Sequence, residues 1–185
     1  NHAAGKVSDS LISQIDVYPT ICDMLEIRKP DYLQGRSFAG LFTDPEQEIN
    51  SEVFAEVTYH AAYEPMRCIR TSRYKLIRYF DYHNGYVPAN IDASPSKEDM
   101  IDAGLLLQTH EREMLFDLAL DPLERKNLVN SNDCKEIYDD LRLRLENWME
   151  RTGDPLLRVG YRVPKPAGAW VNRLSDLDPG CTLSE

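Results

Sequence analysis

The sequence predicts an α+β fold: a small antiparallel sheet of about four strands with one long helix packed on it. Segments in which apolar and polar side chains alternate fall between residues 53 and 118, as half-buried strands do. Residues 133–151 instead repeat their apolar side chains at helical spacing. Strands joined by tight turns pair antiparallel, and a helix that covers one face of such a sheet produces the α+β arrangement.

A shorter helix is expected first, over residues 16–26. Asp16 suits its N-cap, and Pro19 lies in the first turn, where its missing N–H costs little. Lys29-Pro30 ends the helical pattern. Gly35 then predicts a turn, and one short helical segment is expected after it.

Four strands follow along the chain. They are expected at residues 53–60, 66–71, 74–80 and 113–118. Ser72-Arg73 joins the second and third strands as a tight hairpin. The connection from the third strand to the fourth, residues 81–110, is the least regular stretch, with one or two helical turns expected near its end, at 100–107. A connection of this length is usually a functional flap or a disordered segment.

The long helix has an apolar stripe and a recognisable end. Its stripe consists of Ile137, Leu141, Leu145 and Trp148. Arg142 and Glu146 can pair across one turn, and Gly153 fits the C-terminal cap. Before this helix, residues 121–124 read Asp-Pro-Leu-Glu, which is the capping-box pattern of a helix start.

Composition limits the classes of partner. Apolar residues make up 42% and charged residues 28% of the 185 residues, the balance of a globular protein. No apolar run approaches the roughly 20 residues that span a bilayer, so no membrane partner is expected. The net charge of −10 argues against nucleic acid, because phosphate binding needs clusters of Lys and Arg. An anionic ligand would need a local basic pocket.

Cysteines and acidic pairs do not predict a metal site. The four cysteines form no Cys-x-x-Cys pair, so neither a zinc nor a redox site is expected. Cys22 and Cys68 lie in apolar patterns and are expected to be buried thiols, whereas Cys181 has no evident partner. Asp139-Asp140 lies on the long helix, where a solvent-facing acidic pair is favoured over a metal site.

Several motifs, in a fixed order, resemble one enzyme family. Residues 15–20 read Ile-Asp-Val-Tyr-Pro-Thr, and residues 33–37 read Leu-Gln-Gly-Arg-Ser. Further along come Glu-Val-Thr at 56–58, Pro-Met-Arg at 65–67 and Leu-Phe-Asp-Leu at 115–118. This order resembles the C-terminal portion of sulfatases, enzymes of the alkaline-phosphatase-like superfamily. The likeness is greatest to the heparan N-sulfatase (sulfamidase) branch, and Tyr63, Trp148, Thr152, Asp154 and Pro155 add to it.

The resemblance implies that the parent protein cleaves an S–O or S–N bond of a sulfated sugar. It also implies a formylglycine nucleophile and a calcium ion, both in a catalytic domain that precedes residue 1. No Cys or Ser here stands in the family's Cys/Ser-x-Pro-x-Arg motif, so no catalytic residue, no metal ligand and no cofactor is expected in this chain, and the isolated chain should be inactive. The compartment stays unknown, although the resemblance is compatible with a periplasmic, secreted or lysosomal enzyme.

The resemblance also suggests a domain organisation. Residues 1–45 would be the tail end of the α/β catalytic domain and would include its last helix. Residues 46–163 would be the C-terminal α+β subdomain, and residues 164–185 a surface tail. A polar stretch that contains Pro45 marks the boundary. The catalytic domain of the same protein is then the main partner of this chain, together with the sulfated sugar.

Four residues are candidates for substrate binding: Glu56, Thr58, His60 and Arg67. The first three project from one face of the first expected strand, and Arg67 sits on the loop immediately after it. A sugar site wants a carboxylate for hydroxyl or amino groups and a guanidinium for sulfate. The alternative is that these residues occupy a solvated sheet face, as polar strand residues usually do.

Other features leave alternatives open. A basic cluster, Arg70, Arg73, Lys75 and Arg78, is either a solvated sheet face or a patch for a polyanionic glycan. Tyrosines at 79, 82 and 86 could form a lid or a homodimer contact. Two rival functions also stand beside the sulfatase hypothesis: a phosphate or phosphonate ester hydrolase of the same superfamily, and a non-catalytic binding module.

Overall fold

The computed structural model describes residues 4–81, 83–158 and 163. The predicted surface tail, Cys181 and Tyr82 lie outside these residues. The chain forms two compact units. The first comprises the stretch up to Phe54 with residues 69–75 and 116–126, and the second comprises residues 55–68, 76–115 and the stretch from Asn127 onward. The domain boundary expected near residue 45 stays a prediction.

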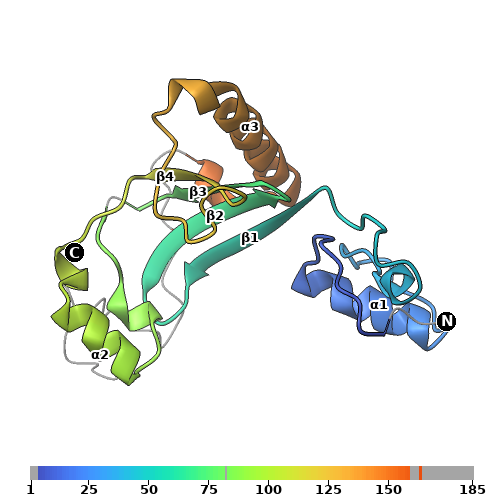
Figure 1. The fold of residues 1–185 in the computed structure, drawn as a ribbon. Coiled ribbons are helices and arrows are strands. Elements are labelled where there is room, and N and C mark those ends of the chain that lie inside the picture. Colours follow the sequence, from blue (N-terminus) through green and yellow to red (C-terminus); the bar gives the residue numbers. More distant parts are fainter. Residues whose placement is uncertain (1–3, 82, 159–162, 164–185) are drawn as a thin grey trace. The chain divides into compact units, whose positions relative to one another are not determined.

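A four-stranded antiparallel sheet confirms the predicted fold class. Its strands are β1 (Glu52–Tyr59), β2 (Tyr63–Thr71), β3 (Tyr74–Tyr79) and β4 (Glu113–Asp117), and they lie side by side in the order β1-β2-β3-β4 (Figure 1). The sheet is therefore a meander, because each strand pairs with its neighbour in sequence. At the end of β3, the Phe80 N–H donates to the Pro65 carbonyl at 2.9 Å and the Tyr79 N–H donates to the Arg112 carbonyl at 2.8 Å.

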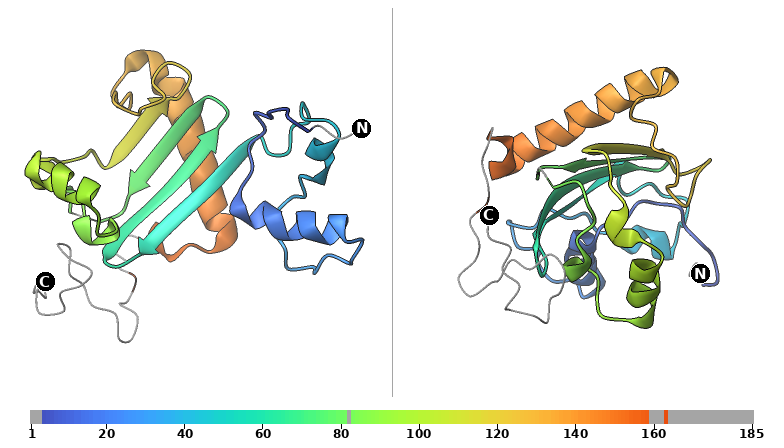
Figure 2. Two further views of the ribbon diagram at one scale, coloured as in Figure 1. Left: turned by 60° about the horizontal axis from the view of Figure 1, so that its bottom comes forward. Right: turned by 90° about the vertical axis from the view of Figure 1, so that its left-hand side faces the viewer.

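The long helix α3 (Lys135–Thr152) packs on the part of the sheet that belongs to the second unit, as Figure 2 shows. Its buried stripe consists of Leu141, Leu145 and Met149, at a spacing of four residues. Of the expected stripe, Leu141 and Leu145 are buried, whereas Ile137 and Trp148 are only half-buried and Met149 is buried in addition. The helix ends at the expected Gly153, whose φ of 69° is the left-handed conformation that glycine favours.

Residues of the first unit explain the two N-terminal motifs. The first helix is α1 (Val17–Met24), preceded by the short 3-10 turn η1 (Gln14–Asp16). The Asp16 side chain does not cap α1, which corrects the expectation. Its buried carboxylate instead accepts from the backbone N–H of Ser13 at 2.8 Å, the backbone N–H of Arg36 at 2.7 Å and the amide of Asn50 at 2.8 Å. The motifs at 15–20 and 33–37 are thus held together by one carboxylate.

Gly35 is needed for this contact. A Cβ atom at this position would lie 2.0 Å from the Ile15 carbonyl oxygen, a distance that no side chain tolerates. The short helical segment expected after it is η2 (Ala39–Phe42).

Cys22 is fully buried, as predicted, but Cys68 is only half-buried, which corrects the second expectation.

Residues 83–110 are more regular than the sequence indicated. They contain η3 (Pro88–Asn90), α2 (Pro95–Asp102) and η4 (Leu105–Leu107). The expected helical turns at 100–107 therefore begin earlier, where the Ser94 side chain caps α2 by accepting from the Lys97 N–H at 3.2 Å. Val87 and Ala89 pack with Ala62 in a small buried cluster. The described part of this connection is therefore ordered, and its role as a functional flap stays a prediction.

The predicted capping box at residues 121–124 is wrong. The segment forms a turn, and Glu124 has a φ of 54°, which no helix start permits. The Glu124 carboxylate pairs with the Lys75 ammonium at 2.8 Å instead of reaching back to Asp121.

Within the described residues, no helix combines the length and the apolar character that spanning a bilayer requires.

Candidate functional site

Three of the four predicted site residues form one cluster of hydrogen bonds and ion pairs around Arg67, which lies in strand β2 and not on the loop expected there. This arginine is only 3% exposed, and its guanidinium donates five hydrogen bonds. Two go to the Asp154 carboxylate, at 2.5 and 3.3 Å, and one to the Thr58 hydroxyl, at 3.2 Å. The other two go to the backbone carbonyls of Val57 and Met66, at 2.8 and 2.9 Å.

This arrangement uses every N–H of the Arg67 guanidinium, which has five. Arg67 therefore joins β1, β2 and the segment directly after α3 in this conformation. Glu56 lies at the edge of the cluster, with its Oε2 atom 3.3 Å from Arg67 Nε and its side chain 60% exposed. Glu56 can thus accept hydrogen bonds from a ligand in solvent while the cation behind it holds it in place.

His60 lies outside this cluster, at the start of the turn between β1 and β2. It is exposed, and its backbone N–H donates to the Ala62 carbonyl at 3.3 Å. We name residues 60–62 the β1–β2 turn. Asn90 from η3 contacts this turn, because its side-chain oxygen accepts from the backbone N–H groups of Ala61 and Ala62.

Sequence reasoning missed Asp154 and Asn90 as partners of these residues. Asp154 is 87 positions from Arg67, and it entered the sequence analysis only as part of the family likeness. Asn90 lies within the irregular connection, where no periodic pattern marks a side chain as buried. Nothing in the sequence pairs these positions.

An aromatic cluster lies at the end of β3. The rings of Tyr79 and His110 stack with centroids 3.8 Å apart, and Tyr86 contacts His110 edge-on at 5.7 Å. Burial, and then the nearby charges of Glu64 and Tyr86, raise the pKa of Tyr79 to about 12. Two of the three predicted tyrosines thus make ring contacts within the chain itself, while their role as a lid or a dimer contact stays a prediction.

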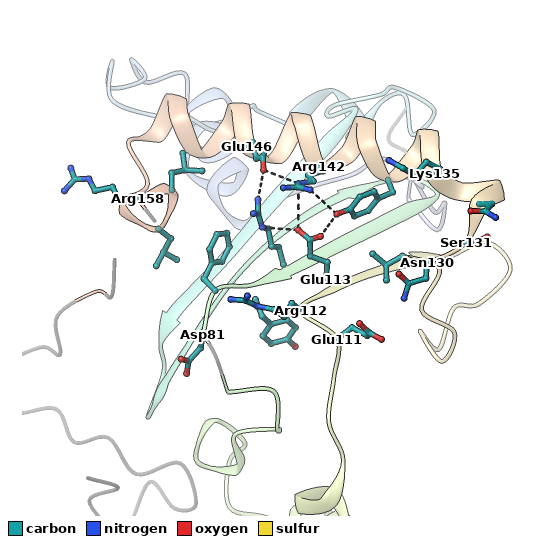
Figure 3. Close-up of a pocket in the computed structure, with 18 of the residues that line it drawn as sticks. Asp81, Glu111, Arg112, Glu113, Asn130, Ser131, Lys135, Arg142, Glu146 and Arg158 are labelled. Atoms are coloured by element: carbon teal, nitrogen blue, oxygen red, sulfur yellow. Dashed lines mark hydrogen bonds and ion pairs between the residues drawn. The ribbon is translucent and has the colours of Figure 1, made fainter. Parts of the chain in front are cut away.

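A groove of about 1190 Å³ lies between α3 and the strands β3 and β4 (Figure 3). A network of ion pairs forms its wall. Arg78 contacts Glu113 at 3.1 Å and Glu146 at 2.7 Å, and Arg142 contacts Glu146 at 3.2 Å, which confirms the predicted helical pair. The Tyr138 hydroxyl donates to Glu113. Burial raises the pKa of Glu146, but the hydrogen bonds from Arg78 and Arg142 outweigh it and lower the pKa overall.

The predicted basic cluster is mostly paired with acids. Besides Arg78, Arg73 binds Asp117 at 2.8 Å and Lys75 binds Glu124. These pairs favour the alternative of a solvated sheet face over a glycan-binding patch. Asp139 and Asp140 are more than half exposed, as predicted. Among the residues that the structure describes, no group of three His, Cys, Asp or Glu side chains could hold a metal ion.

The four-stranded sheet with its C-terminal helix is a module found in sulfatases. The structure of a 2-O GAG sulfatase matches 95% of this chain and 33% of its own with a TM-score of 0.59 and 24% identity, a likeness that shows the fold alone. Residues 1–102 match the family described as N-sulphoglucosamine sulphohydrolase, C-terminal. The chain therefore belongs to this family, as the motifs predicted.

Relatives with curated functions agree with this assignment. The chain is 32% identical, over 171 residues, to an ulvan-active sulfatase of Formosa agariphila, covering 89% of this chain and 34% of that protein. It is 25% identical over 176 residues to human N-sulphoglucosamine sulphohydrolase, covering 82% of this chain and 34% of that protein. The chain thus spans about a third of the length of these relatives.

Proposed function

We propose that this chain belongs to a sulfatase that removes sulfate from sulfated sugars, and that it lines one side of the substrate pocket. The observation that carries the proposal is the family match over residues 1–102, which includes β1, β2 and the β1–β2 turn. The nucleophile and the metal would come from the rest of the protein. By family likeness these are a formylglycine and a calcium ion, whose charge would stabilise the sulfate oxygens.

The first unit supports a partner within the same protein. Large apolar side chains are exposed on and around α1: Ile12, Ile15, Val17, Tyr18, Ile21, Met24, Leu25 and Ile27 are each at least 41% exposed. An apolar patch of this kind normally marks a contact surface. We assign it to the catalytic domain of the same protein, because residues of this segment match the family and the relatives are about three times longer.

Within the pocket, we assign the direct contacts to Glu56 and His60. Both are exposed, and a carboxylate and an imidazole suit the hydroxyl and amino groups of a sugar. Thr58 and Arg67 complete the predicted set as positioning residues, because Arg67 gives all its N–H groups to protein oxygens.

The test is to compare Glu56→Gln and His60→Ala in the full-length protein with Glu136→Gln, an exposed acid on α3 that serves as control. Loss of one polar contact should lower kcat/KM on a sulfated sugar about tenfold, mainly through KM. The control should match the wild type. Unchanged kcat/KM in both site variants would exclude the pocket role, and a wild type inactive on sulfated sugars would exclude the function.

The same assay separates the rival functions. A phosphate or phosphonate ester hydrolase would prefer the matched phosphate substrate, and a binding module would retain sugars without hydrolysing them. Membership of a sulfatase family favours the sulfated substrate.

A further inference from the structure

Asn90 makes three hydrogen bonds to the β1–β2 turn and to the strand after it. Its Oδ1 atom accepts from the backbone N–H of Ala61 at 3.0 Å and from that of Ala62 at 2.8 Å. Its Nδ2 atom donates to the Glu64 carboxylate at 2.7 Å. One side chain, 26 to 29 positions away in sequence, therefore holds two of the three backbone amides of the turn, those of Ala61 and Ala62.

The surroundings make this contact rigid. Ala62 is fully buried, so its N–H would be left without water if Asn90 did not bind it. Val87 and Ala89, on either side of the start of η3, pack against Ala62. The Asn90 backbone N–H donates to the Val87 carbonyl at 2.9 Å, which fixes the residue that carries the carboxamide.

We propose that Asn90 is a positioning residue for substrate binding: it holds the β1–β2 turn so that His60 faces the sugar. The proposal rests on the proposed function. It means that residues 88–91 support the substrate pocket. Asn90 itself does not contact the substrate in this account. It acts through the backbone amides of the turn, whose place determines where the preceding imidazole points.

The chemistry of the carboxamide allows a sharp test in the full-length enzyme. Asn90→Asp keeps an acceptor for the two amides but puts a second carboxylate 2.7 Å from that of Glu64. Repulsion between the two charges should displace the turn and lower kcat/KM on a sulfated sugar by about 10- to 100-fold, mainly through KM. Adding Glu64→Gln restores a donor and an acceptor with their roles exchanged. The double variant should therefore recover most of the lost kcat/KM.

Asn84→Asp is the control, because Asn84 is an exposed residue of the same connection. It makes the same chemical change and should leave kcat/KM unchanged. Measured well below the Tm of every variant, where the protein is folded, the loss and the recovery of kcat/KM report on the position of the turn and not on global stability.

Hydrogen exchange adds a readout that does not need a substrate. In Asn90→Ala the amides of Ala61 and Ala62 lose their acceptor, and a peptide spanning the turn should exchange about tenfold faster. Unchanged exchange in this variant, or unchanged KM in both Asn90 variants of an active enzyme, would overturn the proposal. If the wild type hydrolyses no sulfated sugar, the proposed function fails instead, and the exchange experiment still decides whether Asn90 holds the turn.

Discussion

Replacing Asp154 by Asn should lower the free energy of opening of α3. The decrease should be larger than for the removal of any other charged side chain on this helix or directly after it. The Arg67–Asp154 pair is among the most buried ion pairs described, with side chains 4% and 2% exposed. Removing one partner of such a pair leaves an uncompensated charge and typically costs about 3–5 kcal/mol. Glu56, 3.3 Å from the same guanidinium, offsets part of this loss. We therefore expect the lower end, about 3 kcal/mol.

Hydrogen exchange of α3 amides in the full-length protein measures this quantity. A change of about 3 kcal/mol corresponds to exchange that is faster by about two orders of magnitude, if the amides exchange through opening of this region. Asp139→Asn is the matched control, since its pair with Lys135 lies on the same helix but its side chain is 54% exposed. In the control variant the free energy of opening of α3 should change by less than about 1 kcal/mol. Equal effects of the two variants would refute the reasoning.

Two further predictions concern packing and pH. Gly35→Ala should destabilise the protein by about 2–4 kcal/mol, seen as a lower Tm, because the new methyl group meets the Ile15 backbone. Gly40→Ala meets only the movable end of Gln47 and should cost less, so equal Tm values would contradict this account. The pKa of Tyr79 is raised from about 10 in the unfolded chain to about 12 in the folded protein. The protonated phenol therefore contributes its full stabilisation below pH 10, and this contribution is lost as the pH rises to 12. Tyr79→Phe should therefore show a smaller fall in Tm between pH 9 and pH 11 than the wild type, and an equal fall would count against the assignment.

The strands and the long helix were predictable because their signals are local. Alternation in β1 to β4 and the helical stripe of α3 each arise from neighbours that lie within a few residues. Errors arose where a distant partner competes with a local pattern. Glu124 has the sequence context of a capping box, but Lys75 from β3 takes its carboxylate. Asp16 has the context of an N-cap, but Arg36 and Asn50 take its oxygens.

The candidate site likewise contains residues that the sequence could indicate and one whose role it could not. Strand periodicity and family likeness let the sequence propose Glu56 and His60, and their contact with substrate stays a prediction. The role of Arg67 could not be predicted, because a guanidinium suits sulfate and a buried carboxylate equally well. In this structure Arg67 lies beside Asp154, so its guanidinium binds that carboxylate.

The sequence by itself determined the family, the fold class and the place of the first two motifs, because motif order and periodicity are properties of the chain. Only the tertiary structure decided which polar groups meet: Asp16 with Arg36, Arg67 with Asp154, and Asn90 with the β1–β2 turn. The physical reason is that a polar side chain must find a partner when it is buried, and several partners satisfy the same chemistry. Folding selects one of them through packing that brings distant segments together.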